Sequence, residues 1–246
     1  MGFTLALQFL TRIPVTMASI GNDEVMARSM SYFAFIGLLI GGAAAGLHYL
    51  LYQGFSPAVA NLGAIIFVIF LTGNLHGDGL MDTADGIFSG RPRERMLEIM
   101  KDSRVGSHGV MAGVLVILLR FVLLGEMDRT TVMMALVLAP VLGRWAQVYG
   151  AARYPYARSS GGTGSFTSHV GWRELGFNSF VAIGTALVLL QVSGLVLFSA
   201  VLVGTVLFHG WVRSRLGGIT GDTLGAASET IEILTLLMIV ALLSFT

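Results

Sequence analysis

The stretch Asn74-Leu-His-Gly-Asp78-Gly-Leu-Met-Asp82-Thr-Ala-Asp85-Gly86 directly follows an apolar run, residues 58–75, that is long enough to enter a membrane. If this stretch is helical, the spacing of four, four and three places Asn74 and the three aspartates on one stripe of the helix. Like charges on one stripe repel one another, so we expect a cation to share it. Mg²⁺ fits, because it prefers carboxylate oxygens and completes its shell with water and substrate phosphate. The sequence therefore predicts a metal site at a membrane edge.

The whole chain has the composition of an integral membrane protein. Hydrophobic residues make up 54% of its 246 residues and charged residues only 12%, and the mean hydropathy is +0.78. These values are far from those of soluble domains. We therefore predict an all-α, polytopic transmembrane helix bundle that forms a single integral membrane domain over residues 1–246. Apolar segments indicate about seven helices, at residues 30–51, 58–75, 110–126, 130–151, 177–192, 195–211 and 231–245.

Long polar connections alternate with very short ones between these segments. The long connections are residues 1–29, 76–109, 152–176 and 212–230. All Lys and Arg residues except Arg120, Arg129 and Arg144 fall within them, so the positive-inside rule predicts that these polar, active-site loops lie on the cytoplasmic face. Arg120 and Arg144 lie within apolar segments, where an unpaired charge is costly. We expect Arg144 to reach the membrane surface, and Arg120 either to form an ion pair or to face a substrate cavity.

The first twenty residues are only moderately apolar. Residues 2–20 are interrupted by Thr11-Arg-Ile-Pro14, which favours an interfacial or re-entrant segment over a spanning helix. No basic region precedes a small-residue cleavage site, so we expect no removable signal peptide. The chain has no cysteine, and its net charge of +1 gives no reason to expect a nucleic acid partner.

A basic block, Arg91-Pro-Arg-Glu-Arg95-Met-Leu-Glu-Ile-Met-Lys101-Asp-Ser-Arg104, follows the aspartates. An early proline and three apolar residues at helical spacing predict a short amphipathic helix on the membrane surface; these residues are Met96, Ile99 and Met100. Taken alone, such a helix is most often a cationic face bound to anionic lipid. Beside a metal site, Lys101, Arg104 and Arg95 could instead bind a pyrophosphate, because cations and Mg²⁺ together stabilise its charge.

A glycine-rich block, Gly217-Gly-Ile-Thr-Gly221-Asp222-Thr-Leu-Gly225-Ala-Ala-Ser-Glu229, precedes the last apolar segment. Its backbone N–H groups could bind an anion, with Gly221 in a phosphate-binding nest, although a loop with a glycine-rich cap is the commoner origin of this pattern. It is not a P-loop, because no Gly-Lys-Ser/Thr follows. Asp222 is a fourth carboxylate on the same face and a candidate metal ligand. The polar residues 153–169 have the flexibility of a lid and are equally typical of a linker.

His76 and His108 flank the acidic block and could accept a proton near neutral pH, although a histidine in a polar loop is usually only solvated. Serine hydrolase chemistry is unsupported, because the chain has no Gly-x-Ser-x-Gly sequence. Zinc is also disfavoured, since there is neither a cysteine nor a His-Glu-x-x-His pair.

The chain resembles the cobalamin synthase family, the adenosylcobinamide-GDP ribazoletransferases. The resemblance rests on separate stretches in the expected order: Phe9-Leu-Thr-Arg12-Ile-Pro14-Val, His76-Gly-Asp78-Gly-Leu-Met-Asp82-Thr-Ala-Asp85-Gly86, Ile99-Met-Lys101-Asp102-Ser-Arg104-Val-Gly106 and Gly218-Ile-Thr-Gly221-Asp222-Thr-Leu-Gly225-Ala. Together they span most of the chain, which makes the match specific, whereas each acidic block alone would be weak.

The resemblance implies a Mg²⁺-dependent enzyme of the bacterial inner membrane. Its substrates would be adenosylcobinamide-GDP and α-ribazole, or α-ribazole 5′-phosphate. A ribose hydroxyl would attack the cobinamide-bound phosphorus and expel GMP. We expect Asp78, Asp82 and Asp85, with Asp222, to hold Mg²⁺ on the pyrophosphate, and Lys101 and Arg104 to offset charge on the leaving group. His76 or one of the carboxylates would take the hydroxyl proton.

Two other classes share part of this pattern. Asn74-x-x-x-Asp78-x-x-x-Asp82 satisfies the acidic motif of the UbiA-like prenyltransferases, but the second Asp-x-x-x-Asp pair of those enzymes is missing, since Ala226 follows Asp222 at that spacing. A secondary transporter would place its carboxylates near the bilayer midplane, whereas these acids gather on one face. The sequence leaves open whether the acceptor is phosphorylated and whether small-residue helix faces allow a homo-oligomer.

Overall fold

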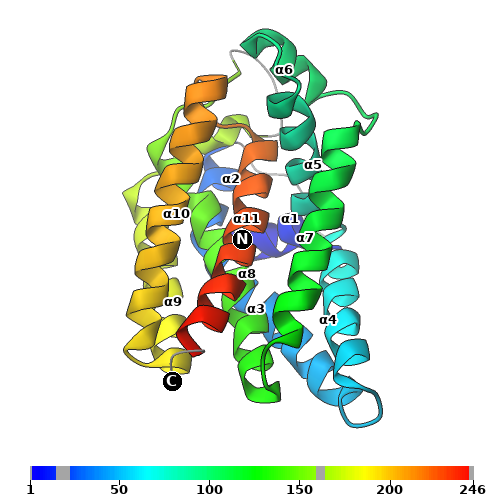
Figure 1. Ribbon diagram of the computed structural model, residues 1–246. Coiled ribbons are helices and arrows are strands. Elements are labelled where there is room, and N and C mark those ends of the chain that lie inside the picture. Colours follow the sequence, from blue (N-terminus) through cyan, green and yellow to red (C-terminus); the bar gives the residue numbers. More distant parts are fainter. Residues whose placement is uncertain (1, 15–22, 159–163, 244–246) are drawn as a thin grey trace.

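The computed structural model describes residues 2–14, 23–158 and 164–243, and these residues form an elongated helical bundle (Figure 1). The helices are α1 (Gly2–Leu10), α2 (Asp23–Ser29), α3 (Phe33–Leu51), α4 (Pro57–Thr72), α5 (Leu75–Phe88), α6 (Arg93–Ile99), α7 (Ser107–Gly125), α8 (Arg129–Arg153), α9 (Trp172–Leu190), α10 (Ser193–Leu216) and α11 (Gly221–Leu243). The 3₁₀ turns η1 (Met30–Tyr32) and η2 (Ser165–His169) precede α3 and α9. No strand occurs within the described ranges, so the predicted all-α class is confirmed.

Within the part of the chain that the structure describes, six helical segments are long and apolar enough to cross a membrane. They are residues 23–51, which end in α3, and helices α7, α8, α9, α10 and α11. Helices α4 and α5 pass the same test only as a pair, and they are bent by 86° at their junction, as in a broken span or a re-entrant loop. The structure is thus that of a multi-pass membrane protein, and the expected number of about seven helices agrees with it.

The bend between α4 and α5 has a local cause in two consecutive residues. Gly73 (φ 63°) and Asn74 (φ 58°) both adopt the left-handed conformation, which glycine takes freely and asparagine more readily than most residues. Asn74 therefore precedes α5, and it does not share the helical stripe of the three aspartates as the sequence spacing suggested. Residues 76–88, expected to open a polar connection, are instead part of α5.

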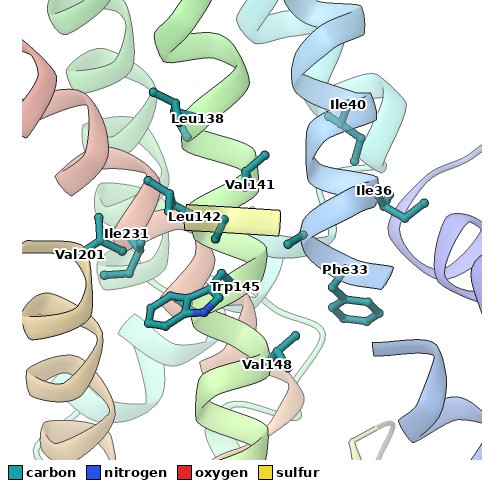
Figure 2. Close-up of a cluster of buried hydrophobic side chains, with 14 of the residues drawn as sticks. Phe33, Ile36, Ile40, Leu138, Val141, Leu142, Trp145, Val148, Val201 and Ile231 are labelled. Carbon is teal, nitrogen blue, oxygen red and sulfur yellow. The ribbon is translucent and has the colours of Figure 1, made fainter. Parts of the chain in front are cut away.

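Helix α8 forms the centre of the bundle and packs against α3, α9 and α11. Figure 2 shows Ile36 and Ile40 of α3 on one side of α8, and Val201 of α10 and Ile231 of α11 on the other. At the α3–α8 crossing, a Cβ atom on Gly37 or Gly41 would collide with the backbone of α8. The glycines spaced four apart therefore let the two backbones approach closely, as small residues do in membrane bundles.

The outer helices turn apolar side chains away from the protein. Only 22% of the spanning windows of α7 and α9, and 28% of that of α10, is buried. Their exposed side chains include Met111, Leu118, Phe180, Val188 and Leu207. Exposed apolar side chains of this kind match the hydrocarbon region of a bilayer, where helices satisfy their own backbone hydrogen bonds.

The two ends of the bundle differ as the alternation of long and short connections predicts. In Figure 1 the α3–α4, α7–α8 and α9–α10 turns lie at one end, while α6 and the first turns of α7 and α11 lie at the other. At the N-terminus, α1 has only nine residues and packs against α2 and α3. It is too short to span a membrane, in line with the expectation for residues 2–20, of which 15–20 lie outside the described part of the chain.

Two further expectations about local structure were wrong. The last helix was expected to begin at Ile231, but α11 begins at Gly221. Thr220 explains the earlier start, because its hydroxyl accepts a hydrogen bond from the Thr223 backbone N–H (3.2 Å) and the Thr223 hydroxyl accepts one from the Thr220 N–H (2.8 Å). This reciprocal pair satisfies N–H groups that the helix start would otherwise leave free.

The second concerns α6, which is amphipathic as predicted but does not rest its apolar face on the membrane. Met96 and Met100 are buried in a small cluster with Ile87 of α5 and with Val212 and Leu216 of α10. The apolar side of α6 therefore packs against the ends of α5 and α10, while its charged side stays exposed.

Candidate active site

The site is built where α5 crosses α11. A Cβ atom on Gly79 would lie 2.7 Å from the Asp222 carbonyl oxygen, and one on Gly225 would lie 3.2 Å from the His76 backbone. A side chain at Gly79 would therefore force the two helices apart, and one at Gly225 would require a shift of a few tenths of an ångström. The crossing brings His76 and Asp78, near the start of α5, to the same place as Asp222 in the first turn of α11.

These three side chains border a cavity of about 230 Å³. One part of its wall is polar and consists of His76, Asp78, Gln147, Thr167 and Asp222. The other part is apolar and includes Phe9, Met30, Phe33, Phe166 and Leu224. Both parts come from distant stretches of the chain, so sequence reasoning located the acids of this cavity but not its aromatic wall.

Asp82 lies one turn beyond Asp78 on α5, and its carboxylate is within the electrostatic reach of the other acids. Asp78, Asp222 and Asp85 each repel a negative charge on Asp82, and Arg158 opposes them. Within the described ranges, no three His, Asp or Glu side chains converge closely enough to hold a metal ion unaided. This donor set still fits Mg²⁺, which protein sites usually bind through one or two carboxylates while water and substrate phosphate complete the shell.

Asp85, a predicted metal ligand, already serves another purpose. Its two carboxylate oxygens accept hydrogen bonds from the backbone N–H groups of Gly106 (2.7 Å) and Gly109 (2.8 Å). A Cβ atom on either glycine would collide with this carboxylate. Because the first N–H groups of a helix lack partners within the helix, Asp85 caps α7 from outside and fixes its start beside α5.

Arg158 is a site residue that the sequence analysis did not single out. Its guanidinium donates a hydrogen bond to the Asp222 carboxylate (3.1 Å), and its side chain is only 11% exposed. The backbone beside it is held by the Ala157 N–H, which donates to the Ile219 carbonyl (2.8 Å). Arg93 of α6 adds a bond to the Ala157 carbonyl (2.7 Å) and one to the Leu216 carbonyl (2.6 Å). The only sequence signal was the position of Arg158 in a conspicuously polar connection.

The predicted phosphate-binding cations do not all lie together. Lys101 borders a surface groove of about 320 Å³ that Arg93 and Arg158 also line. Arg95 instead pairs with Glu98 (2.7 Å) and Arg104 with Asp102 (2.7 Å), on the exposed surface. The bonds from Arg104 lower the pKa of Asp102 to about 2, so this carboxylate stays charged. Exposed pairs of this kind contribute little stability and open readily. Gly221 lines the cavity itself, and His108 is exposed beside Phe88.

The two intramembrane arginines belong to a buried ion network below the site. Arg120 of α7 contacts Glu229 (2.9 Å) and Glu232 (2.7 Å) of α11, and Arg144 of α8 contacts Glu232. Arg120 is thus an ion-pair member, one of the two alternatives given above. Arg144 is 1% exposed, so the expectation that it reaches the surface was wrong. Sequence reasoning placed Glu229 in a polar connection and did not single out Glu232, which lies in the predicted segment 231–245.

Together the fold and the site define a multi-pass helical membrane protein with a carboxylate-lined cavity near one end of the bundle. The cobalamin-5-phosphate synthase family model matches residues 2–240. The chain is 44% identical to an adenosylcobinamide-GDP ribazoletransferase of Desulforamulus reducens over 93% of this chain and 91% of the relative. It is 40% identical to one of Acetivibrio thermocellus (92% and 91%) and 37% identical to one of Clostridium acetobutylicum (98% and 96%).

The chain therefore belongs to the cobalamin synthase family, membrane transferases of cobalamin biosynthesis. No solved structure matches it. The family resemblance read from the separated motifs is confirmed, and so is the assignment as an enzyme.

Proposed function

We propose that the chain joins adenosylcobinamide-GDP to α-ribazole, or to its 5′-phosphate, and releases GMP. The observation that carries this proposal is the α5–α11 crossing, which places Asp78 and Asp222 on one cavity, with Asp82 beside them. The groove lined by Lys101 and Arg158 adjoins Asp222 through the Arg158–Asp222 ion pair. Carboxylates for a metal and cations for a phosphate are the two requirements of phosphoryl chemistry.

Asp78, Asp82 and Asp222 are the residues that would hold Mg²⁺. When bound, the ion would neutralise pyrophosphate charge and so favour attack at phosphorus. Asp85 caps α7 with both oxygens, so in this proposal it positions the site and does not bind the metal. Arg158 already pairs with Asp222 and lines the groove, so it can contact the pyrophosphate by a small movement.

The proposed reaction forms one P–O bond and breaks another. The acceptor hydroxyl attacks the phosphorus that carries cobinamide, and the bond from this phosphorus to the GMP phosphate oxygen breaks. The hydroxyl proton passes to His76 or to a cavity carboxylate, since these groups line the space that the acceptor would enter. Lys101 and Arg158 stabilise the charge that gathers on the departing GMP.

The proposed location is the inner membrane of a bacterium, with the site on the cytoplasmic side. The clustering of Lys and Arg in the long connections supports this orientation. A cytoplasmic site also has access to a nucleotide-bearing donor without transport of that donor across the bilayer.

A turnover assay of the purified protein in lipid tests the proposal. Adenosylcobinamide-GDP and α-ribazole are supplied with Mg²⁺ or with EDTA, and GMP and corrinoid products are separated by chromatography. We expect Mg²⁺-dependent GMP release matched by a joined corrinoid. Folded protein that makes no product with either acceptor would contradict the proposal and direct attention to isoprenyl diphosphate donors.

A further inference from the structure

The aromatic wall of the site cavity has no part in the phosphate chemistry proposed above. Phe9 and Phe33 are stacked, with centroids 5.8 Å apart and an interplanar angle of 19°. Phe166 meets Phe9 edge to face at 6.1 Å and 85°. The three rings come from α1, α3 and η2, and all of them line the cavity. Figure 2 shows Phe33 at the first turn of α3, at the edge of the buried core.

The cavity therefore has an aromatic side and a polar side. Its aromatic side is opposed by His76, Asp78 and Asp222 together with Gln147, which is 3% exposed. The described lining contains no Lys or Arg, and Arg158, which does not line the cavity, is paired with the Asp222 carboxylate, so the lining itself offers no cation to a phosphate on the acceptor. A ligand that fits must present a flat apolar group at one end and neutral hydrogen-bonding groups at the other.

Size narrows the class of ligand further. The volume of about 230 Å³ lies below the roughly 300–1,000 Å³ of pockets that bury drug-sized ligands. A corrinoid is far larger, so the donor must stay outside this cavity and reach it only with its pyrophosphate. A heterocyclic base with its ribose has a volume of the same order as this cavity.

We propose that this cavity is the acceptor subsite and binds a nucleoside with an uncharged, apolar aromatic base. The base contacts Phe9, Phe33 and Phe166, and the ribose hydroxyls face Asp78 and Asp222. Any 5′-phosphate points out of the cavity, towards the cations of the groove. This inference rests on the proposed transferase reaction and adds to it a base-binding wall and a preference for an apolar base.

Kinetics of Phe166→Leu and Phe9→Leu variants test the subsite. Stacking of a base on an aromatic side chain contributes about 1–3 kcal/mol, so losing one ring should raise KM for α-ribazole about tenfold. KM for adenosylcobinamide-GDP should stay unchanged, because the donor lies outside the cavity. The rise should be the same for the 5′-phosphorylated acceptor. A matched control is Phe180→Leu on α9, where the side chain is 75% exposed on the lipid-facing surface.

A second comparison varies the acceptor and not the protein. The wild type should use a riboside of dimethylbenzimidazole with a lower KM than one of adenine, whose polar edge would lose its hydrogen bonds against the phenyl rings. Leucine variants whose acceptor KM is unchanged, or whose donor KM rises in parallel, would overturn the subsite while leaving the transferase reaction intact. A wild type that makes no joined corrinoid would instead count against the proposed function. If Phe166→Leu does not fold, Phe9→Leu carries the test, since Phe9 is only half-buried.

Discussion

Asp82 and Asp85 lie one turn apart on α5, yet their surroundings give them different tasks. Helical spacing predicted that they would act together as metal ligands. It could not reveal that Gly106 and Gly109 would donate backbone hydrogen bonds to Asp85, because that contact depends on how α7 packs beside α5. Asp82, in contrast, lies among the charges of Asp78, Asp85 and Asp222.

Replacing Asp82 with Asn should reduce turnover by at least about a hundredfold, because it removes a charge that holds the metal against the pyrophosphate. The variant should remain folded in lipid, since Asp82 is only half-buried and lies among like charges. Turnover and thermal unfolding measured on the same preparation separate the two effects. Near-normal activity would rule out the metal role of Asp82.

Replacing Asp85 with Asn should act mainly on stability. The amide keeps one oxygen acceptor and opposes the second backbone N–H with its own donor, which costs about 1–3 kcal/mol. We expect a lower Tm with the Mg²⁺ concentration for half-maximal activity unchanged. Asp102→Asn on the exposed loop is the matched control and should leave the Tm unaltered. If the variant instead kept its Tm but needed more Mg²⁺ for half-maximal activity, Asp85 would be a metal ligand.

At the scale of elements, α11 shows where sequence patterns fail. Its first ten residues contain Gly221, Asp222 and Glu229, a composition typical of a loop, and the hydropathy signal alone begins near Ile231. In the structure these residues are helical: the Thr220–Thr223 pair satisfies N–H groups at the helix start, and Glu229 and Glu232 pair with Arg120 and Arg144 inside the bundle. Apolar segments such as α3 and α8 were predicted well, since they need no distant partner to be recognised.

The buried network predicts a large effect of Glu232→Gln. Glu232 is 3% exposed and bonds to Arg120 and Arg144, so its loss leaves a buried charge without compensation. Breaking such a pair typically costs about 3–5 kcal/mol. Equilibrium unfolding in detergent should show a loss of this size, while Glu24→Gln, which breaks the exposed pair with Arg28, should change stability by less than about 1 kcal/mol. Equal effects of the two variants would show that the network does not stabilise the bundle.

At the scale of the whole molecule, charge and hydropathy predicted which connections share a face. The aromatic wall of the cavity could be recognised only in the folded structure, because its three rings come from distant stretches of the chain.

The absence of cysteine makes the orientation easy to test. Single cysteines at Ser56, in the α3–α4 turn, and at Ser103, in the basic connection, are both exposed. In right-side-out vesicles an impermeant maleimide should label position 56 at once and position 103 only after permeabilisation. The reverse pattern would invert the proposed topology.

The central claim is that α5 and α11 together form one metal and pyrophosphate site. Mn²⁺ binding measured by electron paramagnetic resonance, with GDP present and Mn²⁺ in place of Mg²⁺, tests it most directly. We predict one tightly held ion in the wild type, lost both in Asp82→Asn on α5 and in Asp222→Asn on α11, and retained in Asp102→Asn. Wild-type Mn²⁺ affinity in both site variants would contradict the account.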